Sequence, residues 1–159
     1  MNRFVSFLIN FGIAFFGLIL GPYFIVLLNK KLHLNTVNNI LLTDLGISFI
    51  LLGAILFVYC FGLFLLGGLG NPLMTEPPKD FIEKNIYSYS RNPMYFGYMV
   101  ILLGESLYVG SFLLYCYFFL IVLLLHYYVI YIEEPLLIRK FGFRYKQYME
   151  RVPRWVLKI

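Results

Sequence analysis

Long apolar runs alternate with short polar stretches along most of the chain. One run extends from about Phe4 to Leu28 and a second from about Ile40 to Leu66, with the polar stretch NKKLHLNTVNN between them. Each run has about 25 residues, which is enough for a helix that crosses a bilayer with some tilt. No small-residue cleavage site follows the first run, so we expect a retained span rather than a signal peptide.

A second pair of apolar runs follows a connection rich in glycine, proline and polar residues. These runs extend from Pro93 to about Val109 and from Phe112 to about Ile132, and the dipeptide GS between them predicts a tight helical hairpin. The third run spans roughly 25 Å as a helix, a little less than the hydrocarbon core, so a half-submerged hairpin is the alternative to a full crossing. The pattern predicts an all-α, polytopic membrane protein with about four transmembrane helices.

The chain becomes amphipathic after Glu133. Apolar residues recur there at spacings of four and three, namely Leu137, Phe141, Tyr145, Tyr148 and Val152. Basic residues fill the other faces of the same predicted helix. A basic amphipathic helix of this kind is typical of the membrane surface.

Composition and charge support a membrane location and predict an orientation. Hydrophobic residues make up 61% of the 159 residues and charged residues only 13%, which excludes an ordinary soluble domain. If the N-terminus is cytoplasmic, eleven Lys and Arg residues lie inside and only Lys30 and Lys31 lie outside. Both termini are therefore predicted to be cytoplasmic. Most of the net charge of +5 then faces anionic headgroups, so we expect membrane lipids and not nucleic acid as partners.

Two polar features converge on the predicted cytoplasmic face. The stretch NIYSYSRNPMYFGY, residues 85–98, places four tyrosines at the start of the third apolar run. An aromatic belt at the headgroup level would explain these tyrosines alone. However, two adjacent carboxylates, Glu133 and Glu134, leave the fourth run on the same side. The combination favours a binding site over a belt.

The order of these motifs resembles the isoprenylcysteine carboxyl methyltransferase family and its phospholipid-methylating relatives. The motifs are Phe81-Ile82, Tyr87, SRNPMYFG, the hairpin, EEPLLIRKFGFRYKQY and VPRW, and they cover about residues 67–155. The resemblance implies a membrane methyltransferase that uses S-adenosylmethionine. It also implies that residues 67–159 form the methyltransferase-like core, whereas residues 1–66 form a two-helix membrane scaffold.

The resemblance also implies roles for individual residues. Predicted cofactor contacts are Lys79, Asp80, Phe81, Ile82, Tyr87, Asn92, Pro93, Met94, Tyr95, Glu133 and Glu134. The residues predicted to take part in catalysis or acceptor binding are Arg91, His126 and Glu134, and no metal site is expected. Asn92 stands where many relatives have histidine. Asn85 stands where others have glycine, and asparagine tolerates a left-handed backbone better than most residues.

The acceptor is expected to be an amphiphile, with a phospholipid-like or an isoprenylcysteine carboxylate-like head. Residues 114–137 contain no Lys or Arg, so Arg91 and a protonated His126 are expected to be the only nearby cations. A prenylcysteine carboxylate is therefore the less favoured acceptor. Two other functions compete: a non-enzymatic four-helix membrane module or small transporter, and a membrane reductase that uses a nicotinamide cofactor. The double glutamate favours the methyltransferase.

Overall fold

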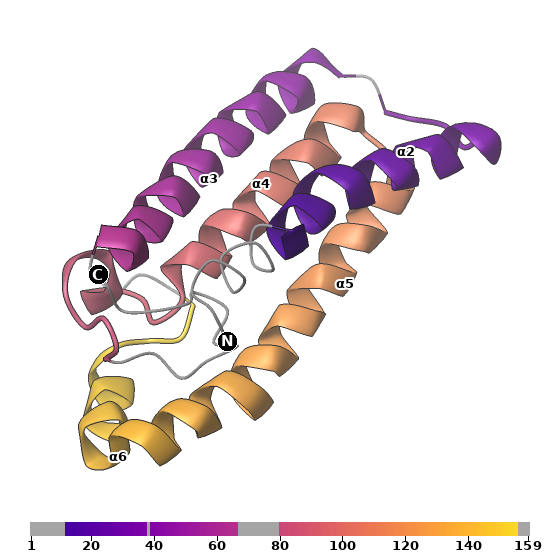
Figure 1. Ribbon diagram of the computed structural model, residues 1–159. Coiled ribbons are helices and arrows are strands. Elements are labelled where there is room, and N and C mark those ends of the chain that lie inside the picture. Colours follow the sequence, from indigo (N-terminus) through magenta and orange to yellow (C-terminus); the bar gives the residue numbers. More distant parts are fainter. Residues whose placement is uncertain (1–11, 38, 67–79, 156–159) are drawn as a thin grey trace.

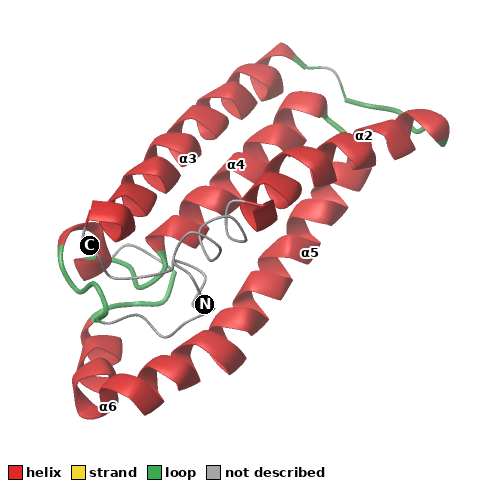
Figure 2. Ribbon diagram, viewed as in Figure 1, coloured by secondary structure: helices red, strands yellow, loops and turns green. Residues whose placement is uncertain are grey.

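The computed structural model describes residues 12–37, 39–66 and 80–155, and these residues form a helical bundle (Figure 1). Its elements in chain order are the π-helical turn η1 (Phe16–Leu20), α2 (Gly21–Lys31), α3 (Ile40–Leu66), the 3-10 turn η2 (Asn85–Ser88), α4 (Pro93–Val109), α5 (Phe112–Tyr128), the π-helical turn η3 (Val129–Glu133) and α6 (Glu134–Arg151). Figure 2 shows helices and loops but no strand in this part of the chain. The predicted all-α fold class is confirmed.

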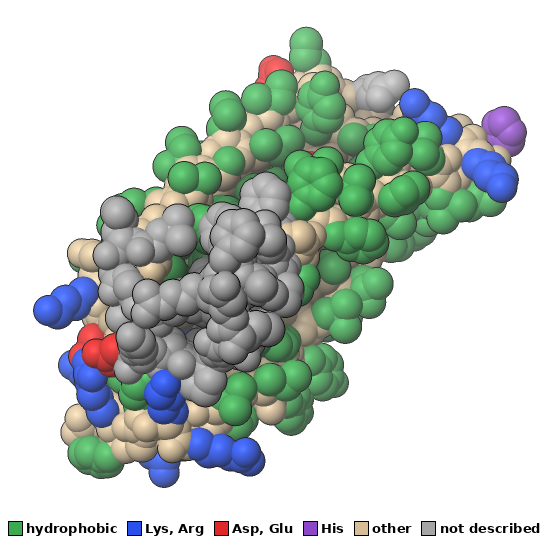
Figure 3. Space-filling model, in the orientation of Figure 1, with side chains coloured by type: hydrophobic (Ala, Val, Ile, Leu, Met, Phe, Trp, Pro, Cys, Tyr) green, Lys and Arg blue, Asp and Glu red, His purple; other side chains and the backbone are tan. Residues whose placement is uncertain are grey.

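Three helices of the described chain are long and apolar enough to cross a membrane, namely Gly12–Lys31, Ile40–Phe64 and Phe112–Arg151. Large apolar side chains along α3, such as Leu51 and Ile55, are more than half exposed, which suits a surface that faces lipid. Apolar side chains also cover much of the face shown in Figure 3. The protein is therefore an integral membrane protein. Helix α4 has 17 residues and is not among the three, so a fourth crossing stays a prediction.

Two glycine pairs bring α3 and α4 into close contact. Gly46 faces Gly104, and Gly53 faces Gly97, so the two pairs lie seven residues apart on each helix. A Cβ atom on Gly53 would lie only 2.7 Å from the carbonyl oxygen of Gly97. Small residues of this kind let the backbones of membrane helices approach each other. The contact fixes α4, and with it the residues of its first turn, against α3.

The turn between α4 and α5 forms the predicted hairpin. Gly110 ends α4 with a left-handed φ of 64°, a conformation that suits glycine. Ser111 caps α5 by accepting a hydrogen bond from the Leu114 backbone N–H, and its hydroxyl donates to Asn29 Oδ1 at 2.8 Å. This turn and the end of α2 therefore lie together, at the end of the bundle away from α6 (Figure 1).

Helix α6 follows η3 and packs its apolar face against the connection before α4. Leu137, Tyr145, Tyr148 and Val152 form one buried cluster with Phe81, and Phe141 packs against that cluster. Gly142 interrupts the helix with φ 56° and ψ −128°, a backbone conformation that other residues rarely adopt. The predicted location of α6 at the membrane surface stays a prediction.

Candidate active site

The loop before α4 is joined to the end of the described chain by hydrogen bonds. The Arg91 backbone N–H donates to the Pro153 carbonyl at 2.9 Å, and Asn92 Nδ2 donates to the Arg154 carbonyl at 3.1 Å. Pro93 occupies the first turn of α4, where a proline costs no helical hydrogen bond, as the sequence predicts. Residues 153–155 are therefore held beside the start of α4.

The two adjacent glutamates are both buried, and they have different partners. The Tyr95 hydroxyl donates to Glu133 Oε2 at 2.9 Å. Arg154 donates twice to Glu134, from Nε to Oε1 at 2.8 Å and from Nη2 to Oε2 at 2.9 Å. A bidentate pair of this kind is strong and fixes both planar groups. The hydrogen bonds to Glu134 raise the pKa of the Arg154 guanidinium above its ordinary value, so Arg154 stays charged.

Arg91, which lies just before α4, contacts the same carboxylate of Glu134. Its Nη1 lies 2.8 Å from Glu134 Oε1, and both side chains are buried. Arg91 Nη1 is thus occupied by its ion pair with Glu134, whereas the buried Arg91 Nε has no hydrogen-bond partner within the described chain. The N–H of Nε can therefore donate to an oxygen atom of a ligand.

His126 is bonded to the end of the described chain rather than to the glutamates. Trp155 Nε1 donates to His126 Nδ1 at 3.1 Å, and the two rings are stacked. An imidazole nitrogen that accepts a hydrogen bond carries no proton, so this bond requires neutral His126. The expectation that Arg91 and a protonated His126 are the only nearby cations is wrong, because Arg154 is an additional cation at Glu134.

The predicted residues Asp80 and Phe81 lie on the apolar side of α6. The Phe81 ring packs against Tyr145 and Tyr148, with centroid distances of 5.3 and 5.4 Å. Arg144 lies over the Phe81 ring at 4.7 Å and pairs with Asp80 at 2.9 Å. These contacts hold the connection against α6, next to the glutamates. Lys79 lies outside the described residues.

Tyr87 lies in the 3-10 turn η2 and is buried between α3 and α6. Its ring meets Phe64 edge-on at 5.9 Å, and its carbonyl accepts a hydrogen bond from the Tyr148 hydroxyl at 2.7 Å. Burial raises the pKa of Tyr87 well above its ordinary value, so its hydroxyl stays protonated. Asn85 begins the turn with a φ of 56°, which confirms the left-handed conformation expected at this position.

The structure brings most of the predicted site residues to the end of the bundle where α6 begins. Tyr87, Met94 and Tyr95 form one buried cluster, against which Ile82 packs, and Trp155 packs against the same cluster. Arg91, Asn92, Pro93 and the two glutamates adjoin it through the contacts described above. His126 reaches the group only through Trp155. Sequence reasoning missed Arg154 and Trp155, although the VPRW motif that contains them was part of the resemblance.

Comparisons with known proteins agree with this arrangement. A model of the phospholipid methyltransferase family matches residues 42–144. The chain belongs to this family. It is also 33% identical over 72 residues to the protein-S-isoprenylcysteine O-methyltransferase of Schizosaccharomyces pombe, a match that covers 45% of this chain and 30% of that relative. The chain thus spans less than a third of the length of this curated relative. No solved structure matches the chain.

Neither competing function receives support from these comparisons. Both matches are to methyltransferases, whereas a non-enzymatic membrane module and a nicotinamide-dependent reductase were the alternatives. The match of the family model begins within α3 and ends within α6, so it includes the start of α4 and both glutamates.

Proposed function

We propose that this protein is a membrane methyltransferase that uses S-adenosylmethionine and methylates the head of an amphiphilic, lipid-like acceptor. One observation carries the proposal. Tyr95, Glu133, Glu134, Arg91 and Arg154 converge at one end of an apolar helical bundle, in a chain that belongs to the phospholipid methyltransferase family.

The residues at this end of the bundle fit the cofactor. The cofactor carries an ammonium, a carboxylate, a ribose diol and an adenine, and therefore needs acceptors, donors and flat surfaces. Glu133 and Glu134 offer acceptor oxygens. Tyr87 and Tyr95 supply the ring surfaces. Asp80, Phe81, Ile82, Asn92, Pro93 and Met94 are assigned to the wall of this site, and Lys79 to its edge, as the family resemblance implies.

Methyl transfer depends more on the placement of the acceptor than on acid or base catalysis. When bound, the cofactor supplies a methyl group that its sulfonium already activates. The protein then has to hold the acceptor in line and keep water out. Arg91 and Glu134 are assigned to hold the polar head of the acceptor next to the cofactor. His126, kept neutral and oriented by Trp155, is assigned a positioning role rather than that of a base.

The acceptor head can carry either an amine or a carboxylate. A phospholipid-like amine is favoured by the two carboxylates. A prenylcysteine-like carboxylate is a second candidate, because Arg91 and Arg154 together provide two guanidinium groups at Glu134. The site therefore has two cationic groups that could offset the charge of a carboxylate acceptor.

A side-by-side assay separates these acceptors. Purified protein receives methyl-labelled cofactor with either a phospholipid mixture or a short prenylcysteine. We expect labelled lipid from the first, and lower labelling of prenylcysteine. Efficient prenylcysteine methylation that Arg91→Ala abolishes, with cofactor affinity unchanged, would reverse the preference. Labelling of neither acceptor would count against the activity itself.

The orientation that fits this function places the site on the cytoplasmic side, where the cofactor is available. Both termini are then cytoplasmic, and the loop after α2 is outside. Single cysteines at Asn35 and Gln147 test this in sealed vesicles with a membrane-impermeant thiol reagent, after the native Cys60 and Cys116 have been replaced by alanine. The two positions should label from opposite sides, and labelling from the same side would contradict the orientation.

A further inference from the structure

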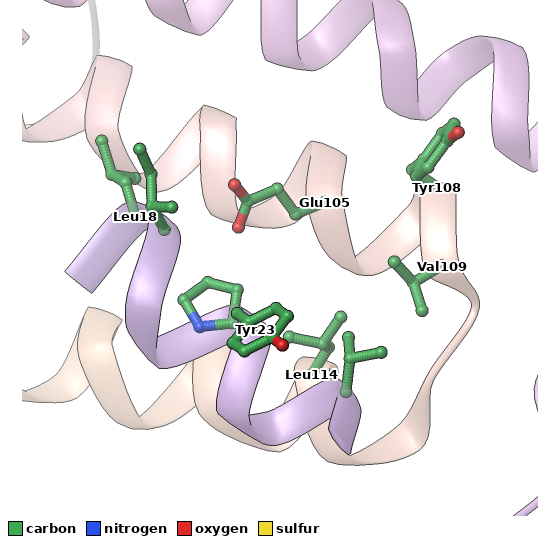
Figure 4. Close-up of a pocket in the computed structure, with 9 residues that line it drawn as sticks. Leu18, Tyr23, Glu105, Tyr108, Val109 and Leu114 are labelled. Atoms are coloured by element: carbon green, nitrogen blue, oxygen red, sulfur yellow. The ribbon is translucent and has the colours of Figure 1, made fainter. Parts of the chain in front are cut away.

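A cavity separate from the candidate active site lies between α2, α4 and α5. It has a volume of about 280 Å³, and its wall is apolar except for the Glu105 carboxylate and the Tyr23 and Tyr108 hydroxyls. Figure 4 shows the Glu105 side chain extending from α4 toward Leu18. Glu105 follows Tyr95 by ten residues, which puts it about 15 Å farther along α4. The cavity is thus not part of the cluster around Glu134.

One oxygen of the Glu105 carboxylate lacks a partner among the described residues. Its Oε2 is buried and has no hydrogen-bond partner within the described chain. A buried carboxylate oxygen without a donor is costly, so a ligand that donates to it gains binding energy. The other carboxylates of the described bundle with buried side chains, Glu133 and Glu134, both have donors. Glu105 therefore differs from them in being available to a ligand.

The walls of the cavity indicate where a ligand enters and what it carries. Tyr23 and Tyr108 are each more than half exposed, so the cavity opens sideways, toward the surroundings of the helices. Apolar side chains such as Leu18 and Leu114 suit an acyl chain. A carboxylate in an apolar wall suits an ammonium group, because it offers the opposite charge. Tyr23 and Tyr108 also line the cavity, and the faces of tyrosine rings attract cations.

We propose that this cavity is a second binding site, which takes the ammonium head of an amphiphile that enters from the bilayer, with Glu105 as its counter-ion. Glu105 lies about 15 Å from Tyr95 along α4, so this second site is separate from the proposed site of methyl transfer. The proposal of a second site does not depend on the proposed function. An anionic head is disfavoured, because Glu105 repels it.

Native mass spectrometry of the purified protein in a neutral detergent tests the site. Phosphatidylethanolamine and phosphatidylglycerol with the same acyl chains are offered separately. The wild type should retain phosphatidylethanolamine about tenfold more tightly, and Glu105→Gln should bring the two lipids close to parity. Asp44→Asn removes an exposed carboxylate of α3 and should leave the preference intact.

Two further variants keep the test decisive if Glu105→Gln does not fold. Tyr23→Leu and Tyr108→Leu retain the carboxylate but remove a ring face, and each should weaken phosphatidylethanolamine binding severalfold. Equal retention of both lipids by the wild type would overturn the proposal. So would a preference that survives Glu105→Gln.

Discussion

Carboxylate groups lie near both ends of helix α4, and their partners differ between the two ends. Near its start, the carboxylates of Glu133 and Glu134 are bound by Tyr95, Arg91 and Arg154. Near its far end, Glu105 keeps a buried oxygen without a partner. Paired buried charges hold segments together, whereas an unpaired one weakens the fold unless a ligand binds to it. Loss of a carboxylate at the start of α4 should therefore cost much stability, whereas loss of Glu105 at the far end should cost little.

The largest expected effect follows from this contrast. Glu134→Ala leaves Arg91 and Arg154 without their carboxylate, and we expect a loss of about 3–5 kcal/mol in the free energy of unfolding. Glu105→Ala removes an unpaired group and should change stability by less than about 1 kcal/mol. Denaturant unfolding in mild detergent measures both. An equal loss in the two variants would break the contrast.

The glycine contact along the middle of α4 should give an intermediate effect. Gly97→Ala places a methyl carbon 3.0 Å from both the Gly53 carbonyl oxygen and the Phe57 backbone nitrogen. We expect a loss of roughly 1–3 kcal/mol from the strained contact between α3 and α4. Gly62→Ala is the matched control on α3, because nothing lies within 4 Å of its added atom. If the midpoint of thermal unfolding falls more for Gly62→Ala than for Gly97→Ala, the glycine contact between α3 and α4 does not contribute as described.

A single hydroxyl at the start of α4 should give the smallest effect. Tyr95→Phe removes the hydrogen bond to Glu133 while keeping the ring, so we expect a stability loss of about 1–2 kcal/mol. Tyr89→Phe changes an exposed tyrosine of the same stretch and serves as the control. The midpoint of thermal unfolding should fall for Tyr95→Phe and stay constant for Tyr89→Phe. The reverse order would show that the Tyr95 bond contributes little.

The helices were predictable because apolar runs and local signals set their limits. Pro93 and Gly110 mark the ends of α4, and the structure places the helix between them as predicted. The asparagine at position 85 similarly indicated a left-handed turn. These features depend on the conformational preferences of single residues and their neighbours, which can be read from the sequence.

The partners of the site residues were not predictable in the same way. Arg154 and Glu134 are 20 positions apart, and Asn92 and Arg154 are 62 apart, so their contacts depend on how the chain returns after Gly142. Arg154 lies well beyond the fourth apolar run, so nothing near it in the sequence indicates that it pairs with Glu134. The contact between the glycines of α3 and α4 was also not predicted. Two glycines seven residues apart in one apolar run do not show which other helix they face.

Equilibrium binding of S-adenosylmethionine to the purified protein tests the central claim most directly. Isothermal calorimetry in detergent should detect binding of the cofactor or its demethylated product by the wild type. Glu133→Gln and Glu134→Gln should weaken this binding about tenfold or more through lost hydrogen bonds to charged groups, while Tyr89→Phe should not. Absence of binding by the folded wild type, together with binding of a nicotinamide cofactor, would contradict the account.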